Sequence, residues 1–202
     1  MRNIIAVLAG LIALLNVIPY IIDIIKRKTK PHIVSWFTWT LLLVIATSAA
    51  FADHQTRSAF LTLGDTIGTL LVLITGIKYG IAKFTWFDGL CQLGAIIGLI
   101  LWLIFNSPSI AIIATICIDF IVSIPTMKHS WQSPGEETWQ AFGLTAFAST
   151  LTLLSLSVFK ITSLAFPAYL LLANLILVII VIYRRRKLGI KLSRGGIPET
   201  IR

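Results

Sequence analysis

The stretch from residue 4 to residue 25 reads IIAVLAGLIALLNVIPYIIDII, and it decides the fold class of the chain. A helix needs about 20 predominantly apolar residues to cross the hydrocarbon core of a bilayer, and this run is that long with Asp23 as its one charged residue. Within a membrane the backbone must satisfy its own hydrogen bonds, and continuous apolar runs of this length do so as helices. The stretch therefore predicts a membrane-spanning helix.

The composition of the whole chain agrees with this interpretation. Of the 202 residues, 57% are hydrophobic and only 12% are charged, and the mean hydropathy is +0.92. Soluble domains are roughly 45–50% apolar, so the composition excludes a soluble enzyme, a disordered chain and a nucleic-acid-binding protein. The net charge of +9 belongs to predicted loops and a C-terminal tail, where basic residues indicate topology and contacts with anionic lipids.

Seven apolar segments follow one another along the chain, separated by short polar breaks. Each is long enough for a transmembrane helix, and we expect an all-α membrane protein with seven of them. The segments are Ile4–Ile25, Ile33–Ala52, Ser58–Ile77, Gly89–Phe105, Ile110–Met127, Thr138–Phe159 and Leu164–Tyr183.

The positive residues are distributed unevenly between the two sides that these helices define. Cytoplasmic loops carry an excess of Lys and Arg, so the N-terminus is predicted outside and the C-terminus in the cytoplasm of a cell membrane, with a bacterial inner membrane as the expected location. The 14 residues on the predicted inner side are Lys26, Arg27, Lys28, Lys30, Lys78, Lys83, Lys128, Arg184, Arg185, Arg186, Lys187, Lys191, Arg194 and Arg202, and the 3 on the outer side are Arg2, Arg57 and Lys160.

Two patterns occur in both halves of the chain and indicate an internal repeat. An Ile-Pro pair closes the first segment at Pro19 and the fifth at Pro125, and a Pro-x4-Trp pattern opens the second segment and the sixth. Two three-helix units in the same orientation need one crossing between them. The predicted organisation is therefore a parallel 3+1+3 arrangement: a first repeat at 1–85, a linker helix at 86–107, a second repeat at 108–183 and a basic cytoplasmic tail at 184–202.

The segment from Pro19 to Thr29 resembles the SWEET and PQ-loop superfamily of small seven-helix transporters. Its Pro-Tyr-Ile-Ile-Asp-Ile-Ile-Lys-Arg-Lys-Thr sequence is similar to the family pattern of Pro-Gln, an aliphatic stretch and Lys-x-Lys-Ser/Thr, although Tyr20 and, in the second repeat, Thr126 stand where the family has Gln. The resemblance implies transport, and it implies hinge prolines near the cytoplasmic ends of four helices. The candidates here are Pro19, Pro31, Pro125 and Pro134; a proline at a helix start also has a purely architectural interpretation.

Asp119 lies in the middle of the fifth segment and is the most informative polar residue. A carboxylate at the bilayer centre costs about 2.5–3.5 kcal/mol, so an intramembrane acid is by default a functional hypothesis. The residue suits proton coupling or substrate binding. The alternative is a structural hydrogen bond between the repeats, with Asn16 as its partner.

Two further polar residues lie inside predicted helices. Asp65 lies about 10 Å below the outer surface, where it lines a water-filled vestibule or bonds Thr62 or Thr66. Asn174 lies in the middle of the last segment. The family resemblance makes an Asn in this helix a candidate substrate contact, and an interhelical hydrogen bond is the alternative.

Two tryptophans and a basic cluster complete the set of candidates. Trp36 and Trp39 share one face of the second helix, where they form an aromatic wall for a ring-shaped ligand or belong to an interfacial belt. Arg184–Lys187 is a run of four basic residues, interpreted as a juxtamembrane contact with anionic lipids.

These features predict a transporter for a small polar metabolite that works by alternating access. Its central site would be lined by Asn16, Asp65, Asp119 and Asn174, with the Trp pair nearby. No nucleotide-binding motif, HExxH or GxSxG pattern is present, so we expect facilitative or proton-coupled transport, no enzymatic activity, no metal and no cofactor. The alternative is a membrane receptor or scaffold on the same fold without net flux. A homo-oligomer is compatible with the sequence but is not required to build the site.

Overall fold

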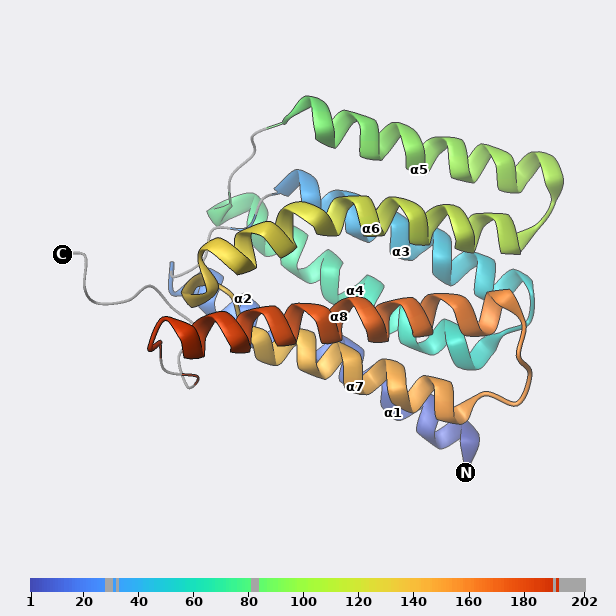
Figure 1. Ribbon diagram of the computed structural model, residues 1–202. Coiled ribbons are helices and arrows are strands. Elements are labelled where there is room, and N and C mark those ends of the chain that lie inside the picture. Colours follow the sequence, from blue (N-terminus) through green and yellow to red (C-terminus); the bar gives the residue numbers. More distant parts are fainter. Residues whose placement is uncertain (28–30, 32, 81–83, 191, 193–202) are drawn as a thin grey trace.

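The computed structural model describes residues 1–27, 31, 33–80, 84–190 and 192, and this part of the chain is helical with no strand. Figure 1 shows the helices lying side by side in one bundle. Their bounds are α1 Arg2–Leu15, α2 Ile18–Ile25, α3 Ile33–Ala52, α4 Thr56–Tyr79, α5 Trp86–Phe105, α6 Pro108–Gln132, the short 3-10 helix η1 Pro134–Glu136, α7 Trp139–Ser155 and α8 Ile161–Lys187.

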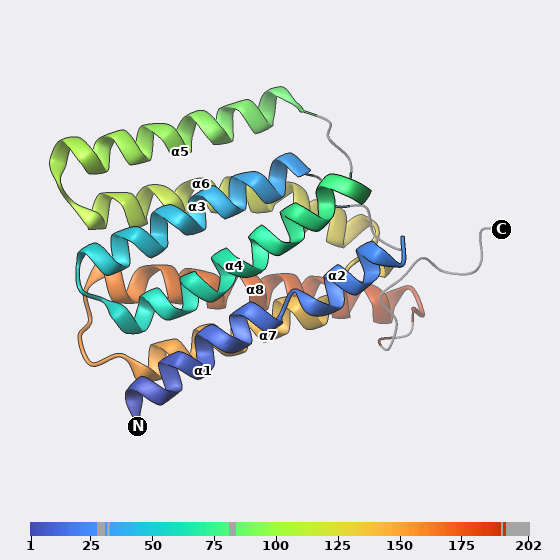
Figure 2. The same ribbon diagram turned by 180° about the vertical axis from the view of Figure 1, so that it is seen from behind.

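The helices run back and forth between two ends of the bundle. We call the end where α1 begins the N-terminal end, and the end where α2, α4, α6 and α8 finish the tail end (Figures 1 and 2). Among the described residues, six helical segments are long and apolar enough to cross a membrane, with α1 and α2 together forming the first. The prediction of an all-α fold is thus confirmed, and the six long apolar helices fit a multi-pass membrane protein. The remaining helix, α7, has 17 residues, at the short end of the range for a span.

The first span is interrupted near its middle. Asn16 and Val17 separate α1 from α2, and Pro19 follows in the first turn of α2. Proline has no N–H and fixes its own backbone, so it starts a helix more readily than it continues one. The interruption places the Asn16 side chain inside the bundle, where only 6% of its surface is exposed.

Six helices, α7 among them, close into a ring. Helix α1 packs on α4 and α7, α3 packs on α4 and α6, and α8 packs on α6 and α7. Helix α5 lies outside this ring against α6 and α3, at the edge of the bundle in both ribbon views.

Glycines allow α1 and α4 to approach closely. A Cβ atom added at Gly10 would lie 2.5 Å from the Phe60 carbonyl oxygen, and one added at Gly64 would collide with the Gly10 carbonyl oxygen. Small residues at a membrane helix interface allow backbone-to-backbone packing, because lipid offers no hydrophobic force to drive association. This contact fixes one side of the ring.

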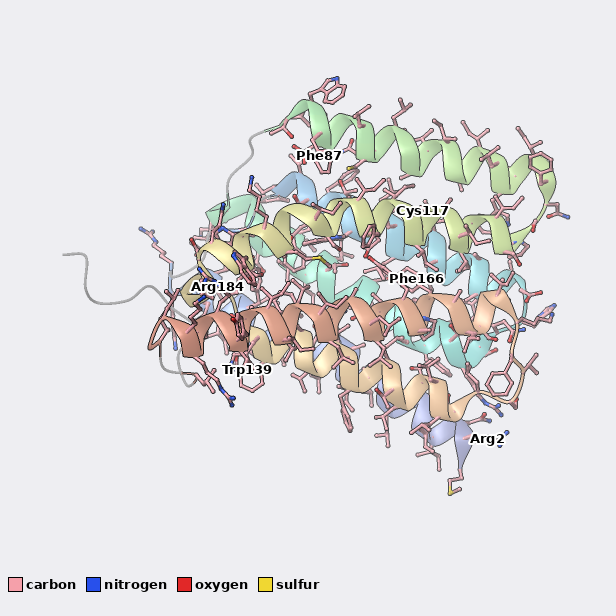
Figure 3. All side chains as sticks on the ribbon, in the orientation of Figure 1. Arg2, Phe87, Cys117, Trp139, Phe166 and Arg184 are labelled. Atoms are coloured by element: carbon pink, nitrogen blue, oxygen red, sulfur yellow. The ribbon has the colours of Figure 1, made fainter. Side chains whose placement is uncertain are left out.

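Two helices extend beyond their predicted ends at the tail end. Helix α6 continues to Gln132 rather than ending at Met127, and α8 continues to Lys187 rather than Tyr183. The predicted boundary of the tail at residue 184 therefore falls inside α8. Figure 3 shows Arg184 and Trp139 at the tail end and Arg2 at the opposite end.

Arg185 departs from the expectation that the basic cluster contacts lipid. Its side chain has no exposed surface, and its guanidinium donates hydrogen bonds to the carbonyl oxygens of Pro134, Gly135 and Glu137 at 2.8, 3.3 and 2.7 Å. Helix α8 thereby holds the α6–α7 connection at the tail end.

Some residues behind the sequence predictions lie outside the described part of the chain. They are Lys28, Lys30, Lys83, Lys191, Arg194 and Arg202, which enter the predicted orientation, and Thr29 of the family-like segment.

Candidate functional site

A cavity of about 570 Å³ lies inside the ring of six helices. Volumes of 300–1,000 Å³ are typical of sites for small molecules. Helices α2, α3, α4, α6, α7 and α8 contribute to its wall, and so does Asn16, directly after α1. The wall includes all six residues that the sequence predicted as substrate contacts: Asn16, Trp36, Trp39, Asp65, Asp119 and Asn174.

Asn16 joins three helices at the centre of the bundle. Its Nδ2 donates to Asp65 Oδ1 of α4 at 3.3 Å and to Thr145 Oγ1 of α7 at 2.7 Å. The expected alternative partners of Asp65 are wrong, because the Thr62 and Thr66 hydroxyls donate to backbone carbonyls of their own helix. Asp65 is 8% exposed, so this carboxyl is buried and bonded across helices.

Asp119 is held from the neighbouring helix α8. The Tyr169 hydroxyl donates to Asp119 Oδ2 at 2.5 Å, and Ser123, one turn further along α6, is another hydrogen-bond partner of the same carboxyl. Asn16, the expected alternative partner, does not reach Asp119. The Asp119 side chain is only half-buried, because it faces the cavity.

Aromatic rings form one wall of the cavity. The ring centroids of Tyr20 and Trp36 are 5.1 Å apart, and those of Trp36 and Trp39 are 5.2 Å apart in an edge-to-face arrangement. Both tryptophans are half-buried and line the cavity. Trp139, the counterpart of Trp36 in the second half, instead donates from Nε1 to the Leu192 carbonyl oxygen at 3.1 Å.

Asn174 lies on α8 in the cavity wall. Its Nδ2 donates to the Leu170 carbonyl oxygen of the same helix at 2.8 Å. Among the described residues it makes no hydrogen bond to another helix, so the interhelical alternative is wrong for this residue.

The cavity extends from the middle of the bundle to the tail end. Its wall runs from Asp65 to His129 and Glu137, and the His129 side chain is 47% exposed there. A second cavity of about 490 Å³ between α3, α5 and α6 shares four wall residues with the first, namely Ser35, Thr126, His129 and Glu137. The half of the ring nearer the N-terminal end is instead filled by a cluster of small and aliphatic side chains that includes Ala46, Ala49, Leu61, Ala111 and Ala148.

Polar contacts close the N-terminal end above this cluster. Asp53 Oδ1 pairs with Lys160 Nζ at 3.2 Å, and Thr162 Oγ1 donates to Asp53 Oδ2 at 2.5 Å. Arg57 donates to Asn3 Oδ1 at 2.9 Å and to Ser157. The hydrogen bond from Thr162, and then the bonds and charge of Lys160, hold the pKa of the Asp53 carboxyl below its ordinary value. We call these residues the N-terminal latch.

The four candidate hinge prolines occupy different settings. Pro19 follows the interruption between α1 and α2, and Pro125 lies inside α6. Pro31 is buried before α3, where a Cβ atom at Gly76 of α4 would lie 3.1 Å from its ring. Pro134 opens η1, and its carbonyl oxygen accepts from Arg185.

Sequence reasoning missed Tyr169, Thr145 and the latch residues. Tyr169 carries a hydroxyl within an apolar span, which is a signal that could have identified it. Thr145 gave no such signal, because Thr commonly bonds the carbonyl four residues back in its own helix, as it does here with Ala141.

Comparisons of the chain with models of protein families, with curated proteins and with solved structures found no match.

Proposed function

We propose that this protein is a small-metabolite transporter similar to the SWEET and PQ-loop superfamily, working by alternating access across a cell membrane. The observation that carries the proposal is the cavity of about 570 Å³, reached from the tail end and walled off from the N-terminal end. A site of this size inside a ring of spans is what a carrier of small solutes needs.

The contacts between helices support the proposed 3+1+3 plan. In the first half, α4 packs between α1 and α3; in the second half, α8 packs between α6 and α7. The halves meet through α3 with α6 and through α1 with α7, so corresponding helices make corresponding contacts. Helix α5, outside the ring, is the proposed linker.

The proposed orientation follows from the positive residues. With the tail end in the cytoplasm, α8 ends there in four basic residues, in accord with the positive-inside rule. The cavity would then open inward, toward the cytoplasm. A bacterial inner membrane is the proposed location.

Opening toward the other side requires the N-terminal latch to break and the two halves to rock about the cavity. The interruption at Asn16–Val17 and the proline inside α6 are the proposed points of bending, since each lacks part of the regular helix hydrogen bonding. Pro31, before α3, and Pro134, at the start of η1, would allow smaller movements at the tail end.

The first experiment is a thermal-unfolding screen of the purified chain against sugars, nucleosides, amino acids, amines and vitamins. A ligand at about 100 times its Kd stabilises the folded state by roughly 2.7 kcal/mol. A hit that Asn174→Ala weakens is then tested for flux in liposomes. Flux supports a transporter, whereas binding without flux identifies the alternative, a receptor or scaffold on the same fold.

Proton coupling is proposed to act through Asp119, which faces the cavity and is held by Tyr169 and Ser123, with Asp65 as the nearby acid. Asp119→Asn keeps the shape of the side chain but cannot exchange a proton near neutral pH. We expect it to abolish the pH dependence of uptake and to leave the fold intact. Unchanged pH dependence in this variant would contradict the coupling role.

A further inference from the structure

The charges around the cavity differ in sign from the charge of the whole chain. The protein has 17 Lys and Arg against 8 Asp and Glu. Among the described residues of the cavity wall there is no Lys or Arg, whereas Asp65, Asp119 and Glu137 all belong to it. His129 is the one basic residue in this part of the wall, and it lies 3.9 Å from Glu137 near the mouth.

The two central carboxyls are held by neutral groups alone. Asn16 donates to Asp65 at 3.3 Å, and Tyr169 donates to Asp119 at 2.5 Å. Within the described part of the chain neither acid has a Lys, Arg or His partner within ion-pair distance. A buried charge is costly unless it is paired with an opposite charge. The two carboxyls therefore lack a positively charged partner at the centre of the cavity.

Several hydrogens that could bind a neutral, hydroxyl-rich solute at this centre are already used. Asn16 directs its amide to Asp65 and Thr145, Thr145 donates to Ala141, and Tyr169 donates to Asp119. Carboxylate oxygens each accept more than one hydrogen bond. An occupant that brings its own donors and positive charge therefore matches the centre.

The remaining wall is aromatic and aliphatic. Tyr20, Trp36 and Trp39 form a contiguous set of rings, and Phe142 and Phe166 also face the cavity. Aromatic faces attract ammonium groups and pack against apolar bodies.

We infer that the cavity takes a small organic cation, an amine or quaternary ammonium with an apolar body, whose charge lies between Asp65 and Asp119 beside the tryptophan wall. This inference rests on the proposed function, because it names the substrate class of the same site.

The test compares cations with ligands of nearly the same shape and different charge. Phenethylamine is set against uncharged phenethyl alcohol and anionic hydrocinnamate, and choline against uncharged neohexyl alcohol, with glucose as a neutral polyol. Binding to the full chain in detergent is measured by thermal unfolding and calorimetry at millimolar ligand concentrations. We expect both cations to bind and their neutral and anionic counterparts to bind far more weakly.

Two variants and a matched control locate the binding. Asp119→Asn and, separately, Asp65→Asn should weaken cation binding about tenfold to one-hundredfold, the range for loss of a charged hydrogen-bond partner. Asp23→Asn makes the same change on α2 outside the cavity and should leave the Kd unchanged. If one variant fails to fold, the other variant still tests the inference, together with the preference of the wild-type chain for cations over their neutral and anionic counterparts.

Three results would overturn the inference: no binding of either cation, equal binding of the neutral counterparts, or cation binding that neither Asp→Asn variant weakens. Flux of choline into liposomes separates this inference from the proposed function. Choline binding without flux keeps the cationic site and contradicts the transporter. Flux of a neutral solute without cation binding keeps the transporter and contradicts the cationic site.

Discussion

The side chain of Asn16 connects α1, α4 and α7 through one amide nitrogen. Replacing it with Ala removes both hydrogen bonds and leaves Asp65 without its donor. Loss of a buried partner costs about 1–3 kcal/mol, and we expect Asn16→Ala to lower the free energy of unfolding by that amount.

Reversible unfolding in mixed detergent measures this loss. Asn3→Ala is the control, because Asn3 is exposed and accepts one hydrogen bond from Arg57 at the surface. An equal effect of the two variants would contradict the structural role of Asn16.

The ion pair between Asp53 and Lys160 makes the N-terminal latch dependent on pH. The pKa of Asp53 is lowered from 3.8 in the folded chain, first by the hydrogen bond from Thr162. A lowered pKa stabilises the folded state at pH values above the ordinary pKa, and this contribution disappears as the pH falls through the folded value. We expect wild type to have a higher Tm than Asp53→Asn at neutral pH, and the difference to shrink as the pH falls below 3.8 and to vanish once the pH is below the lowered pKa of Asp53.

Thermal unfolding of both chains across this pH range is the measurement. Asp23→Asn is the control, since Asp23 takes no part in the latch. A Tm difference between wild type and Asp53→Asn that persists at the acid end would show that the carboxylate charge is not what holds the latch.

At the scale of residues, the sequence predicted which polar groups matter but not how they pair. Asp119, Asp65 and Asn16 were recognisable because polar side chains are rare within apolar spans. Their partners depend on which helices are neighbours, and spacing along one chain carries no information about the Tyr169–Asp119 pair on separate spans. The latch was missed because its members lie in polar connections and in the first turns of helices at the N-terminal end, where such residues are ordinary.

The contact between α1 and α4 depends on the absence of side chains at Gly10 and Gly64. Gly64→Ala would place a methyl group against the Gly10 carbonyl oxygen. Overpacking of a close contact costs about 1–3 kcal/mol, so we expect destabilisation of this size, even though Ala is the better helix former.

The matched control is Gly143→Ala on α7, where an added Cβ atom meets nothing within 4 Å. That variant should be neutral or slightly stabilising in the same unfolding measurement. Equal stability of the two variants would contradict backbone contact between α1 and α4.

The hydrogen bonds from Arg185 to the α6–α7 connection give the second prediction about helix arrangement. Arg185→Gln leaves up to three carbonyl oxygens of the α6–α7 connection without a charged donor. We expect a loss of roughly 2 kcal/mol of stability and faster proteolysis in this connection. The control is Arg186→Gln at the exposed neighbouring position, and this variant should be cleaved at the wild-type rate. Equal cleavage rates in the two variants would contradict the proposed role of Arg185.

At the scale of elements, hydrophobic runs predicted the spans well and their ends poorly. Helices α6 and α8 carry polar residues in their last turns, where the chain leaves the apolar layer without leaving the helix. Pro19 was the one sequence signal for the interruption of the first span at Asn16–Val17, because the apolar run continues across these two residues. Arg185 could not be separated from its basic neighbours, since its burial depends on the position of the α6–α7 connection.

For the whole molecule, the sequence predicted an all-α membrane bundle, and the structure adds the ring. The order of helices around a ring is set by contacts between distant parts of the chain, such as α1 with α7 and α3 with α6. Aromatic and polar side chains of the tail half line the cavity, whereas small and aliphatic side chains pack together in the other half.

Alternating access requires the cavity to be reached from both sides of the membrane at different times. In a chain whose Cys91 and Cys117 are replaced, Thr69→Cys places one thiol in the cavity wall near the middle of the bundle. A membrane-impermeant maleimide is applied to one side or the other of vesicles of known orientation. Thr152→Cys, at a fully buried position outside the cavity wall, is the unreactive control.

We expect the thiol at position 69 to react readily from the tail side, as the cavity in this structure opens there, and also to react more slowly from the N-terminal side when the latch breaks. Reaction from both sides supports a transporter. Reaction from the tail side alone, with and without choline, would describe a fixed pocket and contradict alternating access.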